Sequence, residues 1–437
     1  MGDDHRRKRS GGLRSGPPPP DQTWMSTRLW FVIAGNGVLR VAGGASGVLV
    51  GVYLADLVRR GAHLDAAFAG TLAAMAFGAE LVGALPFGFA ADMVSTRTLM
   101  VGSALLAAAA AALFGLSQNV NVLISSRVLE GVAAAAGVPA LLAHLTDATA
   151  DNPKARAQAM SFFEMSLLVG LALGGVLGSV LWRMAGAAAF VWLGGIYIAA
   201  AALLGAAGVT GAHRGQAWSR SHLWQVLSAP AVWRLAPVWL CMNAIVGVWL
   251  GPTFYFLLTH PSAGPQLLAG LFAADPTWLG AMLFVYACVF GTGLAIWSRV
   301  LPRVALTRVL RVALVAMLAV CGGLWVLNHL GGASLGVRWG LTSVVAGLVM
   351  VESGFTPAAL TLLAGVAGSG AGRCSTMGIY SFLLSLGALA GSLIAGAAGE
   401  RWAIDGLIGA TLVLATVALV LLRLVDPTEA HPGEMRA

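Results

Sequence analysis

Charged side chains are scarce in this sequence. Only 10% of its 437 residues are Asp, Glu, Lys or Arg, whereas 58% are hydrophobic. An ordinary soluble domain carries about 25% charged residues, because polar side chains must cover a surface that faces water. This chain has too few of them, and its mean hydropathy is +0.83. We therefore expect lipid to surround most of it, which excludes a cytosolic enzyme, a secreted disulfide scaffold and a disordered regulator.

Cysteine pairs and catalytic motifs are also missing. The four cysteines lie far apart without CxxC spacing, so neither a disulfide framework nor a metal site is expected. No Ser/His/Asp set, HExxH motif or phosphate-binding loop is present, and we expect neither an enzyme nor a bound cofactor. His144, His260 and His329 stand alone near predicted helix ends or loops, and we expect them at the surface.

The net charge of +8 comes mainly from basic residues in loops and tails. They form no patch interleaved with aromatic residues, so nucleic acid is not expected as a partner. Residues 1–28 hold a basic cluster at 5–9 and four prolines at 17–20 before the first apolar run begins. We expect a disordered basic tail on an anionic membrane face rather than a cleaved signal peptide.

Long apolar runs predict an all-α integral membrane protein, because a chain in lipid must satisfy its backbone hydrogen bonds within helices. We expect two six-helix bundles, 29–209 and 235–424, joined by a cytoplasmic linker at 210–234 and followed by a cytoplasmic tail at 425–437. The twelve predicted helices cover 29–55, 66–90, 98–116, 122–143, 158–181, 187–209, 235–258, 279–297, 309–330, 340–364, 374–398 and 406–424.

The distribution of Lys and Arg predicts the orientation. With the N-terminus in the cytoplasm, 19 of the 26 basic residues fall in cytoplasmic tails and loops, and five fall in outer loops. Cytoplasmic loops of membrane proteins carry this kind of excess. We expect a multi-pass protein of the plasma (inner) membrane with both termini in the cytoplasm, acting as a monomer.

An internal repeat is indicated by residue pairs that match at an offset of 217 positions. Coincidence in a chain rich in Gly and Ala is the alternative. The matching pairs are Arg156 and Arg373, Met160 and Met377, Gly170 and Gly387, and Gly174 and Gly391. Two six-helix halves related by an axis along the membrane normal are the simplest account, and such halves enclose a cavity at mid-depth.

The loop after the second predicted helix has Gly88 four residues before Asp92, with Arg97 following. This pattern resembles the first cytoplasmic-loop motif of the major facilitator superfamily, although the glycine and arginine that usually follow the aspartate are replaced. The likeness covers nearly all of residues 29–424. It implies transport by alternating access, with a conformational latch in which Asp92 and Arg97 pair with Asp147. A solvated polar turn is the alternative.

Two further patterns resemble motifs of the same family. Arg127, Glu130 and Gly131 resemble a motif associated with proton coupling, with Glu130 in place of glutamine. The glycine series Gly170, Gly174 and Gly178 resembles the antiporter motif of the fifth helix, although its proline is absent. Small residues let membrane helices approach closely, and we expect this face to pack against a helix of the other half.

Six ionisable residues fall inside apolar runs, where an unpaired charge costs roughly 2.5–3.5 kcal/mol on insertion scales. They are Arg40, Glu80, Arg127, Glu130, Glu164 and Glu352. Arg40 and Glu352 lie near mid-depth. By family resemblance the first, fourth, seventh and tenth helices line the cavity. This implies a substrate- and proton-binding site that includes Asn36 with Arg40, Arg127 with Glu130, Asn243, and Glu352, and we add Glu80 to it.

Each of these residues also has a structural interpretation. Arg127 and Glu130 are three residues apart and can form a local ion pair. Glu80 can pair with an arginine at the seam between the halves, and Glu164 can extend to the cytoplasmic face. Asn36 and Asn243 can join neighbouring helices by hydrogen bonds.

We expect a secondary transporter that exports a small amphipathic molecule in exchange for protons. A glutamate at mid-depth favours its protonated form when dry and its ionised form when water or an arginine faces it. Glu352 is therefore expected to carry the proton, driven by the proton gradient. Because Arg40 stays charged, proton-coupled uptake or exchange of a small organic anion is the first alternative. A membrane scaffold or sensor that transports nothing is the second.

Overall fold

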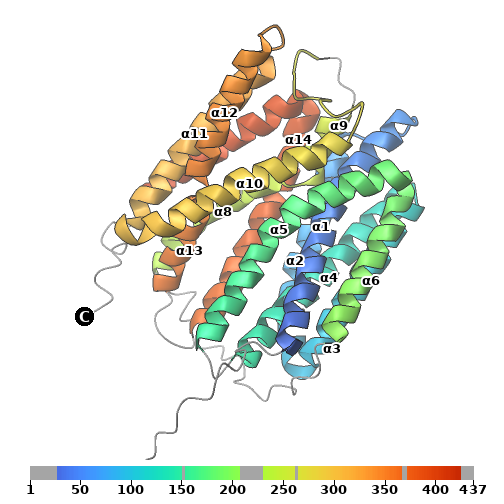
Figure 1. The fold of residues 1–437 in the computed structure, drawn as a ribbon, viewed down its shortest axis with the longest axis vertical. Coiled ribbons are helices and arrows are strands. Elements are labelled where there is room, and N and C mark those ends of the chain that lie inside the picture. Colours follow the sequence, from blue (N-terminus) through green and yellow to red (C-terminus); the bar gives the residue numbers. More distant parts are fainter. Residues whose placement is uncertain (1–26, 150–152, 207–229, 261–263, 367–371, 425–437) are drawn as a thin grey trace, which may run out of the picture.

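The computed structural model describes residues 27–149, 153–206, 230–260, 264–366 and 372–424, and all the regular elements in these ranges are helices (Figure 1). The predicted all-α fold is confirmed. The first six long helices are α1 (Thr27–Arg59), α2 (Ala66–Met93), α3 (Thr96–Leu116), α4 (Val120–Ala148), α5 (Pro153–Ala185) and α6 (Ala189–Ala206). The later ones are α8 (Pro230–Trp249), α9 (Pro252–Thr259), α10 (Thr277–Val300), α11 (Leu306–His329), α12 (Leu335–Glu352), α13 (Phe355–Val366) and α14 (Gly372–Leu421).

Ten stretches of the described chain are long and apolar enough to span a membrane. Two of them, Met165–Ala206 with 42 residues and Phe382–Leu421 with 40, are too long for one crossing. The first contains the turn between α5 and α6, and the second contains a break at Ala403 inside α14. Beyond that break Gly406 packs against Ala398, so the chain reverses there. Dividing both stretches gives twelve candidate spans within the described residues, the number predicted from the sequence.

The seventh and tenth predicted helices are not continuous. The run 235–258 is broken between α8 and α9, where Gly251 is extended and Pro252 begins the new helix. The run 340–364 is broken between α12 and α13. There the Trp297 indole N–H of α10 donates to the backbone oxygens of Met350 and Val351, at 3.2 and 3.1 Å. These bonds help satisfy carbonyl groups at the end of α12.

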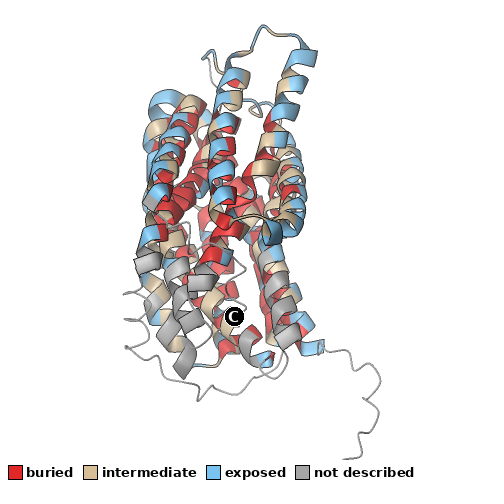
Figure 2. Cartoon of the chain, turned by 90° about the vertical axis from the view of Figure 1, so that its left-hand side faces the viewer, coloured by how far each residue is buried: buried red, intermediate tan, exposed pale blue. Residues whose placement is uncertain are grey.

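The helices form two groups that follow the chain. In the first group α1 packs on α5 and α6, α2 on α4, and α3 on α4 and α6. In the second group α14 packs on α8, and α11 contacts α12, α13 and α14. The groups meet where α2 faces α14, α5 faces α10 and α1 faces α9. Buried residues line these helix faces, whereas exposed apolar side chains cover the outside, as lipid contact requires (Figure 2).

The predicted packing of the fifth helix on the other half is confirmed, since α5 meets α10 at Gly175, but the repeated glycines Gly170, Gly174 and Gly178 contact α1 of their own half. A Cβ at Gly170 would lie 2.6 Å from the backbone oxygen of Arg40 on α1. A Cβ at the repeat-related Gly387 would lie 2.6 Å from the Cβ of Asn243 on α8. Gly174 and Gly178 also pack on α1, and Gly391 packs on Ala244 of α8. The series brings the fifth crossing of each half onto the first.

Other small residues bring the two halves together. A Cβ at Gly70 of α2 would lie 2.5 Å from the backbone oxygen of Ser392 on α14. A Cβ at Gly280 of α10 would lie 2.8 Å from the backbone oxygen of Gly175 on α5. Gly175 and Ser392 are themselves 217 residues apart. Both contacts lie near the end of the bundle where α1 finishes and α2 begins, which we call the Arg59 end. The opposite end is the Thr27 end.

Candidate functional site

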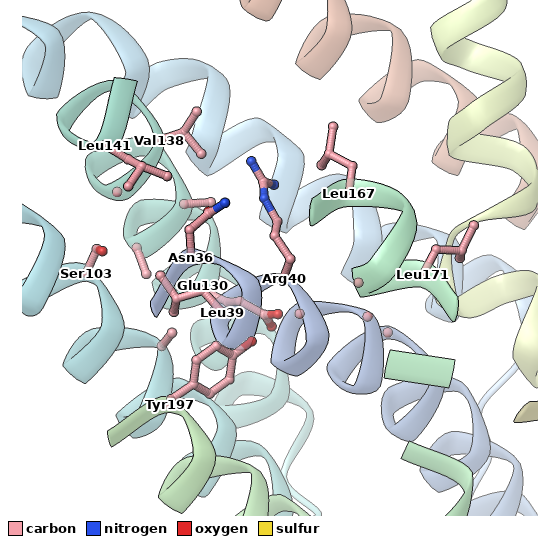
Figure 3. A pocket seen from close by; sticks show the side chains of 18 of the residues that line it. Asn36, Leu39, Arg40, Ser103, Glu130, Val138, Leu141, Leu167, Leu171 and Tyr197 are labelled. Atoms are coloured by element: carbon pink, nitrogen blue, oxygen red, sulfur yellow. The ribbon is translucent and has the colours of Figure 1, made fainter. Parts of the chain in front are cut away.

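A cavity of about 350 Å³ lies among the helices of the first half (Figure 3). Its walls come from α1, α3, α4, α5 and α6, and most lining side chains are apolar or glycine. The second half contributes Leu250 and Tyr255. Gly51 of α1 packs directly on Tyr255 and Pro252 of α9, toward the Arg59 end of the cavity. The polar and charged lining side chains are Asn36, Arg40, Ser103, Glu130, Tyr197 and Tyr255.

Asn36 and Arg40 enter the cavity from one face of α1, a single turn apart. The Asn36 Nδ2 donates to the Ser166 hydroxyl of α5 at 2.7 Å, and that hydroxyl donates to the backbone oxygen of Phe163 at 2.5 Å. The Arg40 guanidinium lies 5.2 Å from the centre of the Phe163 ring. Asn36 therefore joins α1 to α5, as one interpretation predicted, and also lines the cavity.

Glu130 is an acidic group of the cavity and forms an ion pair with Arg127, three residues earlier on α4. The Ser46 hydroxyl of α1 donates to the other carboxylate oxygen of Glu130 at 2.9 Å. Tyr197 of α6 lies close enough to interact with both charges. The local ion pair therefore forms, and it places Glu130 in the cavity wall while Arg127 stays buried behind it.

Glu80 lies at the seam between the halves. Its carboxyl interacts with the Ser385 hydroxyl of α14 and with the positive charge of Arg40. Glu80 is thus the acidic neighbour of Arg40 at the seam, which is the structural interpretation made from the sequence. It is absent from the cavity lining.

Glu352 and Asn243 lie outside the cavity, although both were expected to line it. Glu352 ends α12 at the break before α13, is 9% exposed, and interacts with Tyr286 of α10 and Cys321 of α11. Asn243 donates its side-chain amide to the backbone oxygen of Trp239, one turn back on α8, at 2.8 Å. The second half therefore places the buried carboxyl of Glu352 outside the cavity.

The predicted cytoplasmic latch is only partly within the described residues. The surroundings of Gly88, Asp92 and Asp147, and of the Glu164 side chain, lie outside them. Arg97 is described, and its guanidinium lies beside Gly205 in the last turn of α6. His144 was expected at the surface but is buried on α4 beside Thr96, which corrects that prediction.

Three cavity residues were missed, because only the first, fourth, seventh and tenth helices were expected to line the cavity and the seventh was expected to be continuous. Ser103 on α3 and Tyr197 on α6 are polar residues inside apolar runs, and that feature marks them in the sequence. Tyr255 reaches the cavity because α9 is separated from α8 by the break at Gly251.

The comparison with known proteins agrees with this architecture. A family model described as Major Facilitator Superfamily matches residues 37–353. The chain belongs to the Major Facilitator Superfamily. This family consists of transporters and not of enzymes, and its members are multi-pass integral membrane proteins. A segment of 115 residues is 32% identical to the inner membrane transport protein YajR of Escherichia coli (strain K12), covering 26% of this chain and 24% of YajR.

Solved structures of this superfamily share the fold at low identity. The nucleoside transporter NupG superimposes with a TM-score of 0.70 at 11% identity, covering 91% of this chain and 98% of NupG. A bacterial homologue of the human lysosomal transporter Spinster, inward-facing and occupied, gives 0.68 at 14% identity, with 92% and 97% covered. A mutant of the peptide transporter POT in complex with sulfate gives 0.70 at 14% identity, with 91% and 95% covered.

Proposed function

We propose that the protein is a proton-coupled secondary transporter that exports a small amphipathic molecule by alternating access. The observation that carries this proposal is the cavity, whose largely apolar wall is interrupted by Arg40 on one side and Glu130 on another. Ligand sites typically combine an apolar lining with a few well-placed polar groups. The volume of about 350 Å³ accommodates a small molecule rather than a polymer.

The close helix contacts support an inward-facing state. Gly51, Gly70 and Gly280 bring the halves together near the Arg59 end, and Tyr255 lies between that end and the cavity. The bias of basic residues toward one side favours a cytoplasmic Thr27 end in the plasma (inner) membrane. With that orientation the cavity is closed toward the outside. The similarity to an inward-facing Spinster homologue is consistent with this state.

Glu352 is the proposed proton carrier. It is buried, it ends a helix whose C-terminus disfavours negative charge, and within the described residues no cation pairs with it. A buried carboxyl in such a place is neutral unless water or a cation reaches it. The adjoining break between α12 and α13 provides a point where alternating access can change that exposure.

Reconstituted vesicles with a pH-sensitive dye test the coupling. Solute-driven proton flux is measured for cationic, anionic and neutral amphipathic solutes, in wild type, Glu352→Gln and Glu80→Gln. Glu352→Gln should abolish solute-driven proton movement while solute counterflow continues. Unchanged proton flux in Glu352→Gln would reject the assignment, and a loss found only in Glu80→Gln would move the proton site to the seam.

Arg40 favours a second candidate, proton-coupled uptake or exchange of a small organic anion. A guanidinium in an apolar cavity binds carboxylate or phosphate strongly. Arg40→Ala should then weaken binding of an anionic solute by about tenfold or more, while cation binding is unchanged. Arg338→Ala, on an exposed part of α12, is the matched control. Equal affinity for the anion in Arg40→Ala would exclude this candidate.

A further inference from the structure

His329 lies at the Arg59 end of the second half, in the last turn of α11, outside the cavity lining. Both nitrogens of its ring face oxygen atoms. Nδ1 lies 2.9 Å from the backbone oxygen of Trp325, and Nε2 lies 3.3 Å from the Oδ2 of Asp405 on α14. A backbone oxygen and an ionised carboxylate can only accept hydrogen bonds, so this arrangement requires a donor on each ring nitrogen.

Only the doubly protonated ring of His329 provides two donors. A neutral imidazole carries one N–H and one lone pair, so either tautomer turns a lone pair toward Trp325 or toward Asp405. The charged ring donates to both. Its positive charge also suits the end of α11, because a helix C-terminus attracts a cation. The Trp325 ring, whose centre lies 4.8 Å from that of His329, favours a cation as well.

The shared proton belongs on His329 rather than on Asp405, because the carboxylate already accepts other donors. The side-chain amide of Asn328 donates to Oδ1 at 2.9 Å, and that of Gln266 donates to Oδ2 at 3.0 Å. Both oxygens are therefore engaged as acceptors, which is the role of an ionised carboxylate.

The pair is open to the solution at the Arg59 end. The side chains of His329 and Asp405 are 35% and 24% exposed, so their proton can exchange with that solution. Within the described residues, Asp405 is the carboxylate that pairs with His329. The other ionisable side chains at this end of the surrounding elements have different contacts: Arg338, Glu400 and Asp275 bond to backbone groups, Arg401 lies over Trp402, and His260 stacks on Phe256.

Asp405 also anchors the segment 264–276, which precedes α10, through its bond with Gln266. Gln266 bridges the break inside α14 as well. It donates to the backbone oxygen of Trp402 at 2.8 Å and accepts from the backbone N–H of Ile404 at 3.0 Å. The N–H of Ile404 begins the last crossing, where backbone donors lack partners within the helix. Gln266 thus caps that crossing from the segment 264–276.

Asn328 ties the same segment to α11. Its backbone oxygen accepts from the N–H of Leu267 at 2.8 Å, and its side-chain oxygen accepts from the N–H of Leu268 at 2.9 Å. Farther along the segment, two more backbone N–H groups donate to oxygens in the last turn of α9, at 2.9 and 2.8 Å, from Gly270 and Phe272. Because α9 carries Tyr255 into the cavity wall, the segment connects the carboxylate site to that wall.

We propose that His329 and Asp405 form a proton-binding clasp that fixes the segment 264–276 when the solution at the Arg59 end is acidic. Histidine is the side chain that ordinarily changes charge between about pH 5 and pH 8. When the proton leaves, a lone pair of His329 faces an oxygen, its contact with Asp405 becomes repulsive, and the attachment around the carboxylate loosens. The pH at this end then sets how firmly α9 is held against the cavity. The clasp requires neither a transported solute nor the proton carriage proposed for Glu352.

Amide hydrogen exchange of the full chain in detergent tests the clasp. Peptides from 264–276 are followed from about pH 5.5 to about pH 8, with a correction for the intrinsic pH dependence of exchange. The protection factors should fall about two- to fivefold as the pH rises, the size expected for one partly exposed charge pair. In protein labelled with ¹³C-histidine, the NMR signal of His329 Cε1 should titrate over the same pH range.

His329→Gln makes the test specific and assigns the NMR signal. The glutamine amide can donate to Asp405 but carries no titrating proton, so the protection should become independent of pH. Asp405→Asn removes the charge, keeps one acceptor and should also abolish the dependence; adding it to His329→Gln should cause no further loss of pH dependence. His63→Gln is the matched control, because His63 is an exposed histidine between α1 and α2 at the same end. It should keep the wild-type dependence.

Equal corrected protection at both ends of the pH range in wild type would overturn the proposal. A pH dependence that persists in His329→Gln would overturn it as well, and a dependence lost in His260→Phe but kept in His329→Gln would assign the proton to His260. Solute transport by vesicles enters none of these outcomes, so the clasp and the proposed function are tested separately.

Discussion

Gly186 and Ala403 both have a positive backbone φ, of 54° and 49°, and they are separated by 217 residues. Gly186 lies between α5 and α6, and Ala403 interrupts α14 at the corresponding reversal in the second half. The repeat first noticed in glycines therefore extends to the turn that follows them. A positive φ suits glycine but strains a residue that has a Cβ.

Ala403→Gly should stabilise the fold by about 1 kcal/mol. Ala403 has φ 49° and ψ −129°, a region that costs a non-glycine residue about 1–3 kcal/mol. Glycine removes this strain, but its greater freedom in the unfolded chain lowers the gain by about 0.5–1 kcal/mol. Thermal unfolding in detergent, followed by tryptophan fluorescence, measures the change. Gly186→Ala is the converse experiment. It should destabilise the fold because it places a Cβ on a residue with positive φ, although no heavy atom lies within 4 Å of that Cβ. A lower midpoint for Ala403→Gly would contradict this account.

Gly391→Ala should destabilise the second half by about 1–3 kcal/mol through overpacking. The new Cβ would overlap the backbone oxygen of Ala244 on α8, so α14 must move away from α8. Gly409→Ala is the control, in the crossing of α14 that follows the break at Ala403, because no heavy atom lies within 4 Å of its Cβ position. Unfolding midpoints of the two variants are compared in the same detergent. Equal midpoints would show that the stability of the second half does not require the close approach of α8 and α14.

Glu130→Gln should destabilise the first half by about 2 kcal/mol, because it leaves the buried Arg127 guanidinium without its anion. Ser46→Ala removes only one hydrogen bond to Glu130 and should cost about 1 kcal/mol. The double change Arg127→Met with Glu130→Leu should recover much of the loss, since no charge is then left unpaired. Thermal unfolding again provides the measurement. If the single variants unfold like wild type, the Arg127–Glu130 ion pair does not stabilise the fold.

His260 should make the Arg59 end sensitive to acid. Burial first, and then the positive charge of Arg59, lower the pKa of His260 below 6.5. The unfolded chain therefore binds a proton at a higher pH than the folded one, so the stability is complete above about pH 6.5 and declines as the pH falls. Unfolding midpoints between pH 8 and pH 5 test this. His260→Phe keeps the stacking on Phe256, whose ring centre lies 5.2 Å away, and should reduce the decline of the midpoint with falling pH. An unchanged decline in this variant would assign the acid sensitivity to other groups.

Much of the architecture was predictable from the residues because lipid leaves few choices. Apolar runs of membrane length must be helices, so the spans were predicted with boundaries near those observed. The reversals at Gly186 and Ala403 separate runs that the sequence already divided. The breaks in the seventh and tenth crossings were not predicted, because Gly251 and the Ser353–Gly354 step stand inside runs that are apolar on both sides.

The site was predictable only in part. Asn36, Arg40 and Glu130 were recognised because polar groups are costly in lipid, and the structure brings all three to one cavity. Glu352 met the same criterion but lies elsewhere. Depth along a helix follows from residue number, whereas the neighbour that a side chain faces depends on how each helix is rotated and broken.

The sequence by itself determined that this chain is a bundle of membrane-spanning helices built from two related halves, because hydropathy and repeat spacing depend only on the order of the residues. Only the tertiary structure decided that Gly170 and Gly387 face the first helix of their own halves, that Glu80 lies at the seam beside Ser385, and that Glu400 reaches Ala66. These contacts join residues far apart in the chain. They depend on helix rotation and packing, which no local pattern specifies.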